Sequence, residues 1–151
     1  MARPSYNTLV IAIDFSSATD AVLARGLDLA KRLGARAEVV YTTPRLDPAL
    51  PFHRTNRRAV AKLQREELSG ARAALRELVA DCDSPVGTNV RVGAAHAEIL
   101  AFAKEKRAGL IVLGKRGQNL AESLLLGSTA DRVLRKATIP VIVVPVPLRQ
   151  G

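Results

Sequence analysis

Short strand-like segments alternate with longer helix-like segments along this chain of 151 residues. The clearest strand-like segment covers residues 9–13, and the others cover 37–42, 86–92, 110–113 and 141–146. Short apolar runs without alternation are typical of strands that are covered on both faces, as in a parallel sheet. The alternation therefore predicts a doubly wound α/β fold, in which right-handed crossovers carry about four helices.

The segments between the strands have the periodicity and the end signals of helices. Ser16 or Ser17 is expected to cap a first helix that runs to about Leu33, with Gly34 just past its end. A long amphipathic helix over residues 55–80 is expected next, followed by helices over 95–106 and 128–136. The residues of the long helix expected to face the core are Leu63, Leu68, Leu75, Leu78 and Val79.

Length and composition favour a single domain over residues 1–151, since 48% hydrophobic residues can form a substantial core. No run of 18 or more apolar residues occurs, so we expect a cytoplasmic protein with no membrane partner. The net charge of +9 attracts polyanions, but the arginines are scattered in the sequence, with one dense cluster from Arg54 to Arg65, and aromatic residues make up only 3%. Nucleic acid is therefore not expected as a partner.

A glycine-rich segment follows the strand-like run 110–113 at once. Gly114, Gly117, Gly127 and Ser128 form a G-x2-G-x9-G-S pattern, which differs from the common dinucleotide and P-loop fingerprints. Glycine allows close approach of backbone N–H groups to a ligand, and Ser128 can cap a helix whose N-terminus attracts anions. Asp14 also ends a strand, and ligands of parallel sheets lie beyond the carboxyl ends of strands. The pattern therefore indicates a phosphate site.

Four blocks of sequence together resemble the universal stress protein family, in its ATP-binding subgroup. They cover residues 11–16, 108–117, 126–135 and 139–144, and the similarity extends over nearly the whole chain. The resemblance implies a five-stranded parallel sheet in the order 3-2-1-4-5, with ATP, alone or with Mg²⁺, beside the first and fourth strands. It also implies a homodimer through the last strand, from Val141 to Val146. An unpaired edge strand supports that dimer independently.

The resemblance also assigns roles to individual residues. Asp14 would contact the adenosine, the backbone near Thr42 would border the adenine, and Gly114 would lie against the ribose. The phosphates would be held by Gly117, Gly127, Ser128 and Thr129, and Lys115 and Arg116 would add positive charge. The chain departs from the family pattern at Gly109, where Asp is usual, at Tyr41-Thr42, where His-Val is common, and at Lys115-Arg116.

The function expected from these residues is a nucleotide-dependent stress-response or regulatory factor with at most slow ATP hydrolysis. No catalytic residue and no metal ligand is assigned, because neither His53 nor His96 has a partner at metal-binding spacing. Two alternatives remain: a dimeric interaction module for an unknown protein partner, and a protein that binds AMP or cyclic AMP instead of ATP.

Overall fold

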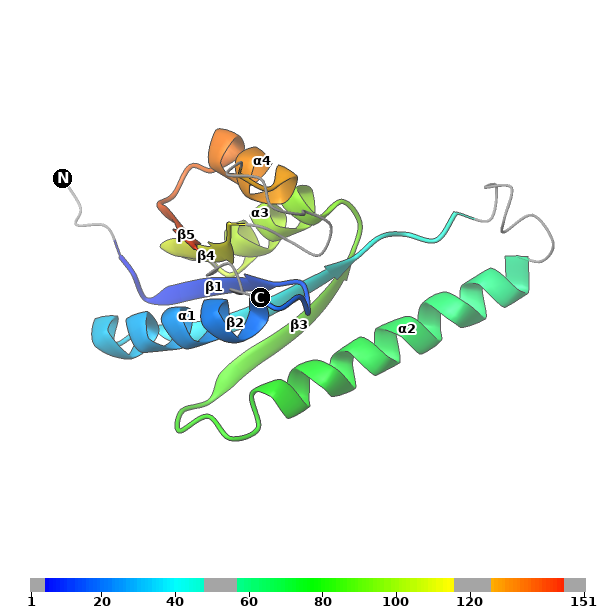
Figure 1. The fold of residues 1–151 in the computed structure, drawn as a ribbon, viewed down its shortest axis with the longest axis horizontal. Helices are drawn as coiled ribbons and strands as arrows, with labels where there is room; N and C mark the ends of the chain where they lie inside the picture. Colours follow the sequence, from blue (N-terminus) through cyan, green and yellow to red (C-terminus); the bar gives the residue numbers. More distant parts are fainter. Residues whose placement is uncertain (1–4, 48–56, 116–125, 146–151) are drawn as a thin grey trace, which may run out of the picture.

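The computed structural model describes residues 5–47, 57–115 and 126–145 of the chain (Figure 1). The elements are β1 (Thr8–Ile13), α1 (Thr19–Leu33), β2 (Arg36–Thr43), α2 (Arg57–Leu78), β3 (Val86–Val92), α3 (Ala95–Glu105), β4 (Leu110–Gly114), α4 (Ser128–Lys136) and β5 (Val141–Val144). The five strands form one parallel sheet in the order β3-β2-β1-β4-β5. The predicted fold class and strand order are confirmed.

Two helices cover each face of the sheet, as Figure 1 shows, with α1 and α2 below the strands and α3 and α4 above them. Alternate residues of β1 point into the two cores. Leu9 and Ile11 pack on the α1 side, and Val10 packs with Phe102 of α3 on the other side. All four of these side chains are fully buried. The central strands are therefore apolar on both faces, as their sequence predicted.

Helix α1 lies very close to β1 because a glycine occupies the point of contact. A Cβ atom at Gly26 would lie 2.6 Å from Cδ1 of Ile11. The helix ends at Gly34, whose left-handed backbone (φ 63°) directs its N–H toward the carbonyl groups of Ala30 and Lys31. Gly34 thus ends the helix as predicted.

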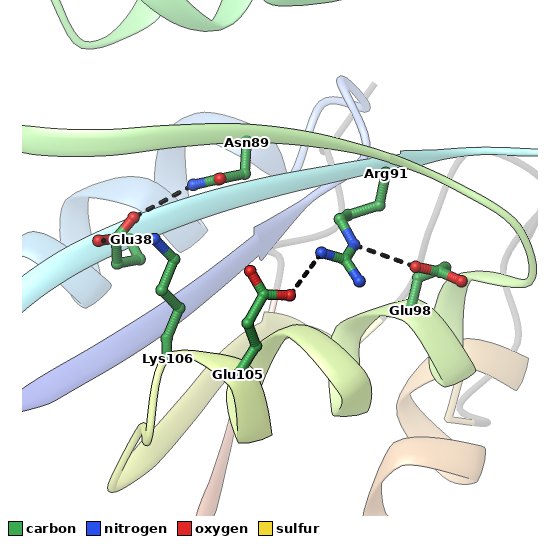
Figure 2. A network of polar contacts seen from close by, with 6 residues as sticks. All are labelled: Glu38, Asn89, Arg91, Glu98, Glu105 and Lys106. Atoms are coloured by element: carbon green, nitrogen blue, oxygen red, sulfur yellow. Dashed lines mark hydrogen bonds and ion pairs between the residues drawn. The ribbon is translucent and has the colours of Figure 1, made fainter.

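The outer part of the sheet next to α3 is polar, in contrast to its centre. Figure 2 shows the buried carboxylate of Glu38 on β2 between Asn89 of β3 and Lys106. Nδ2 of Asn89 donates a hydrogen bond to Oε2 of Glu38 at 3.1 Å, and Nζ of Lys106 lies 3.6 Å from Oε1 of Glu38. Beside them, Arg91 of β3 contacts Glu98 at 3.1 Å and Glu105 at 2.8 Å. A Cβ atom at Gly87 would collide with the Glu38 carboxylate. Ion pairs thus join β3 to α3 where apolar contacts are few.

Two predicted helix caps are wrong. The residue before α1 is Ala18, not Ser16 or Ser17, and it makes no side-chain capping bond. Ser16 instead forms part of the preceding turn, where its Oγ accepts a hydrogen bond from the Ala18 N–H at 3.2 Å. Ser128 is the first residue of α4 and not its cap, because Gly127 occupies the cap position.

The long helix also differs from its prediction. Leu75 is fully buried, and Leu78 and Val79 pack against the same core, as expected. Leu63 is half exposed, because it lies to the side of the buried row that Val60 begins. The last strand ends at Val144, before Pro145, and Val146, the last residue predicted for it, lies outside the described residues.

Candidate functional site

A cleft of about 300 Å³ opens beyond the carboxyl ends of β1, β2 and β4. This volume is at the lower end of the range of small-ligand sites. Seven of the nine residues predicted for the site line this one cleft: Asp14, Thr42, Gly114, Lys115, Gly127, Ser128 and Thr129. The other two, Arg116 and Gly117, lie outside the described residues. The structure thus brings together three segments that are far apart in the sequence.

The turn after β1 orients the acidic wall of the cleft. Oδ1 of Asp14 accepts a hydrogen bond from the Ser16 N–H at 3.0 Å, and the Ser16 carbonyl accepts one from the Thr19 N–H at 3.0 Å. Phe15 between them has a left-handed backbone (φ 56°), which is uncommon for a residue other than glycine. Side-chain and backbone bonds together fix this turn, so the Asp14 carboxylate is held at the edge of the cleft.

Backbone bonds join the two ends of the glycine-rich segment. The Lys115 N–H donates to the Val144 carbonyl at 2.9 Å, and the Gly127 N–H donates to the Lys115 carbonyl at 2.7 Å. The second bond returns the chain to β4, so that α4 begins at the cleft with Ser128, Thr129 and Ala130 in its lining. The first N–H groups of a helix have no acceptor within the helix, and the helix dipole favours an anion there. This wall of the cleft is therefore suited to phosphate.

One residue of the cleft was missed by the sequence analysis. Thr19, the first residue of α1, is only 6% exposed, and its Oγ1 has no hydrogen-bond partner among the described residues. A buried hydroxyl without a partner is unfavourable, and Thr19 lines the cleft. Threonine is so common near the start of a helix that Thr19 does not stand out in the sequence. Its hydroxyl is available to a ligand.

Tyr41 is a second lining residue that the sequence did not assign to binding. Its ring packs edge-on against that of Phe15, with centroids 4.8 Å apart. Burial raises the pKa of Tyr41 above its usual value, and the nearby Glu67 carboxylate adds to this shift. The phenol therefore stays neutral at physiological pH. It gives the cleft an aromatic wall between β2 and the turn after β1.

The described residues include no group of three or more His, Cys, Asp and Glu side chains placed to hold a metal ion. His96 lies in the first turn of α3 and is not part of the cleft lining. Burial lowers the pKa of His96, and the cations Lys136 and Arg132 of α4 lower it further. In the part of the chain that the structure covers, no helix is long and apolar enough to cross a membrane.

Solved structures with bound nucleotides share this fold. A universal stress protein in complex with cAMP superimposes with a TM-score of 0.67, at 23% identity over 92% of this chain and 97% of the other. A universal stress protein from Archaeoglobus fulgidus in complex with dAMP gives a TM-score of 0.57, at 24% identity over 94% of this chain and 99% of the other. At these identities the similarity establishes the fold alone.

Sequence comparison gives the family. The chain is 31% identical to the universal stress protein YxiE of Bacillus subtilis, over 92% of this chain and 99% of the relative. The universal stress protein UspA from Lactobacillus plantarum superimposes with a TM-score of 0.78, at 26% identity over 92% of this chain and 97% of the other. The family model described as the Universal stress protein family matches residues 5–145. With nearly its whole length matched, the chain belongs to the universal stress protein family.

Proposed function

We propose that this protein binds an adenine nucleotide, ATP in the first place, and acts as a nucleotide-dependent regulatory factor in a stress response. The observation that carries the proposal is the convergence of the β1 turn, the end of β4 and the start of α4 on one cleft. The complexes of related folds with cAMP and dAMP support an adenine-containing ligand.

Each wall of the cleft has a role in this proposal. Asp14 accepts hydrogen bonds from the adenosine, and the backbone at Thr42 borders the adenine beside the ring of Tyr41. Gly114 lies against the ribose, where the absence of a side chain permits close approach. In this proposal the adenine thus lies beside the ends of β1 and β2, and the ribose lies beside the end of β4.

The phosphates occupy the other side, at the start of α4. Ser128 and Thr129 supply backbone N–H groups and two hydroxyls, and Lys115 supplies a positive charge. Gly127, whose own N–H is bonded to the Lys115 carbonyl, allows close approach of the phosphates because it has no side chain. Arg116 and Gly117 complete this group in the proposal, although they lie outside the described residues. Donors for more than one phosphate favour ATP. The second candidate ligand is AMP or cyclic AMP, which the two nucleotide complexes of related folds favour.

In this proposal the nucleotide is a signal and not a fuel. Fast phosphoryl transfer requires a group that positions the attacking water, and usually a metal held by side chains. Among the described residues, Asp14 is the carboxylate that lines the cleft, and the proposal assigns it to the adenosine. Asp14→Ala should therefore weaken nucleotide binding and leave any slow hydrolysis rate at saturating ATP nearly unchanged. Turnover of about one per second or faster, lost in this variant, would make the protein an ATPase.

Calorimetric titration with ATP, AMP and cyclic AMP tests the proposal and ranks the ligands. Gly127→Val should abolish binding, because it adds a branched side chain at a residue that lines the phosphate side of the cleft. The variant should still fold, since Gly127 has an ordinary extended backbone (φ −61°, ψ 153°). Gly70→Val is the matched control, because a Cβ atom at this position in α2 meets nothing within 4 Å. Equal affinity of the wild type and Gly127→Val would remove α4 from the site, and no heat with any nucleotide would reject the proposal.

The protein is also proposed to form a homodimer through β5. This strand is at the edge of the sheet, and Ile142 on it is 39% exposed. An apolar edge strand is prone to pair with another chain, and a symmetric pair of β5 strands satisfies its free backbone groups. The dimer is the form in which the protein would present a nucleotide-dependent surface to a protein partner.

A further inference from the structure

A single row of cations runs along the exposed side of α2. Arg58, Lys62, Arg65, Arg72 and Arg76 follow one another at spacings of four, three, seven and four residues. At 3.6 residues per turn, these spacings keep all five within an arc of roughly 80° around the helix. From Arg58 to Arg76 the row extends over about 27 Å at a rise of 1.5 Å per residue. We call these five residues the basic row.

The basic row is on the solvent-exposed side of α2, and its last two residues, Arg72 and Arg76, also border β3, where they line a small pocket. The buried residues of the helix, Val60, Ala71 and Leu75, form a separate row that packs toward the sheet. Glu67 is also on this inner side, where it accepts a hydrogen bond from Thr43 of β2. Figure 1 shows α2 at the outer rim of the molecule, beyond β3. All five cations of the basic row are exposed to solvent.

Among the described residues, little negative charge opposes the part of the basic row from Lys62 to Arg76. Lys62 contacts Glu66 at 3.7 Å, and both side chains are largely exposed, so this pair is weak. Arg65, Arg72 and Arg76 form no ion pair with any other described residue. Neighbouring cations repel one another, and a bound polyanion relieves that repulsion. Each phosphate that a cation neutralises also releases counterions condensed on the polyanion. The row therefore favours an extended, densely charged anion.

We propose that the basic row of α2 binds the phosphate backbone of double-stranded nucleic acid without sequence specificity. A duplex of about 27 Å presents roughly sixteen phosphates, at one charge per 1.7 Å, which is ample for five cations. The scattered arginines of the sequence did not suggest this partner. The helix brings together on one side cations that are as many as eighteen residues apart in the sequence.

Two other anionic partners fit the surface less well. An interfacial membrane helix must insert an apolar face, but the apolar face of α2 is packed in the core through Ala71 and Leu75. Single-stranded nucleic acid is bound largely by stacking on aromatic rings, and α2 contains no aromatic residue. The duplex backbone requires only a row of charges, which is what α2 provides.

The test is fluorescence anisotropy of a labelled DNA duplex of arbitrary sequence, measured over a range of salt concentrations. The wild type should bind with a dissociation constant on the order of 1–100 μM at physiological salt. The slope of log K against log salt should be about −4.5 for five contacts, at about −0.9 per phosphate neutralised. The combined variant Arg65→Ala, Arg72→Ala and Arg76→Ala should reduce the slope to about −2 and the affinity by roughly tenfold or more.

The matched control is the combined variant Arg25→Ala, Lys31→Ala and Lys104→Ala, which removes the same charge from exposed positions on α1 and α3. It should lose much less affinity than the α2 variant. Circular dichroism and nucleotide titration should show that both variants fold, which separates this test from that of the nucleotide cleft. Three outcomes would each overturn the proposal. They are an equal loss of affinity in both variants, no binding of the duplex by the wild type, and tighter binding to phosphatidylserine vesicles than to the duplex.

Discussion

Replacing Thr19 by valine should raise the stability of the free protein and weaken its binding of nucleotide. The hydroxyl of Thr19 is buried beside the cleft and has no partner among the described residues. A buried hydroxyl without a partner costs about 1–3 kcal/mol, and a methyl group of similar shape removes this cost. Valine has the same branching at Cβ, so the start of α1 should be unaffected.

The two effects have opposite signs, which makes the test selective. A gain of about 1 kcal/mol raises the melting temperature of a protein of this size by about 2–4 °C. If the hydroxyl bonds to the nucleotide, its loss costs about 1–2 kcal/mol of binding, or roughly 5- to 30-fold in affinity. Calorimetry measures both quantities, by thermal unfolding of the free protein and by titration with ATP.

Thr43 provides the control, because the same substitution there should have the opposite effect on stability. Thr43 is fully buried, and its Oγ1 donates to the Glu67 carboxylate. Thr43→Val removes the hydroxyl donor from this charged acceptor, whose other donor, Nε2 of Gln64, lies 3.4 Å away. The loss should cost about 2 kcal/mol and lower the melting temperature by about 4–8 °C. A lower melting temperature for Thr19→Val as well would refute the reasoning about its hydroxyl. A higher melting temperature with unchanged affinity would refute its contact with the ligand.

Three further predictions concern packing, titration and assembly. Gly26→Leu should destabilise the protein by about 1–3 kcal/mol in urea unfolding, because Ile11 fills the space that the new side chain needs. Gly70→Ala, at an open helical position, is the control and should stabilise the protein by about 0.5–1 kcal/mol. Equal effects of the two substitutions would contradict the packing argument. Because the pKa of Tyr41 is raised, the folded protein holds the phenol proton more tightly than the unfolded chain does. The contribution of Tyr41 to stability is therefore present below about pH 10 and is lost as the pH rises through the raised pKa. The urea midpoint should fall less steeply in alkali for Tyr41→Phe than for the wild type. Ile142→Glu should convert the proposed dimer into a monomer in light scattering at micromolar concentration, and a monomeric wild type would reject the dimer.

The sequence predicted the fold better than the details of the site. β3 and α4 begin and end at the predicted residues, because turn residues mark their boundaries. The order of the strands came from the family resemblance, since periodicity identifies strands but does not arrange them. The cap of α1 was wrong because Ser16 bonds within the turn after Asp14, which moves the start of the helix to Thr19. Such competition between a turn and a cap depends on backbone geometry that the sequence pattern does not specify.

The cleft was predicted only where sequence motifs mark it. Gly114 and Gly127 were found because glycines at unusual spacing stand out in a sequence. Thr19 and Tyr41 were not assigned, because their roles depend on burial and on a ring contact that forms only in the folded chain. The buried Glu38 was not anticipated either, since its partners Asn89 and Lys106 come from distant elements.

The contact between Glu38 and β3 also selects the register in which this edge strand pairs. The apolar pattern of β3 is weak, and a strand with a weak pattern can slip along its neighbour. In the native pairing Gly87 is opposite Glu38 and leaves room for the carboxylate. A slip of two residues in either direction would put Pro85 or Asn89 there, and the side chain of either would occupy that space. The glycine therefore discriminates against mispaired forms during folding, at a position where hydrophobic burial gives little discrimination.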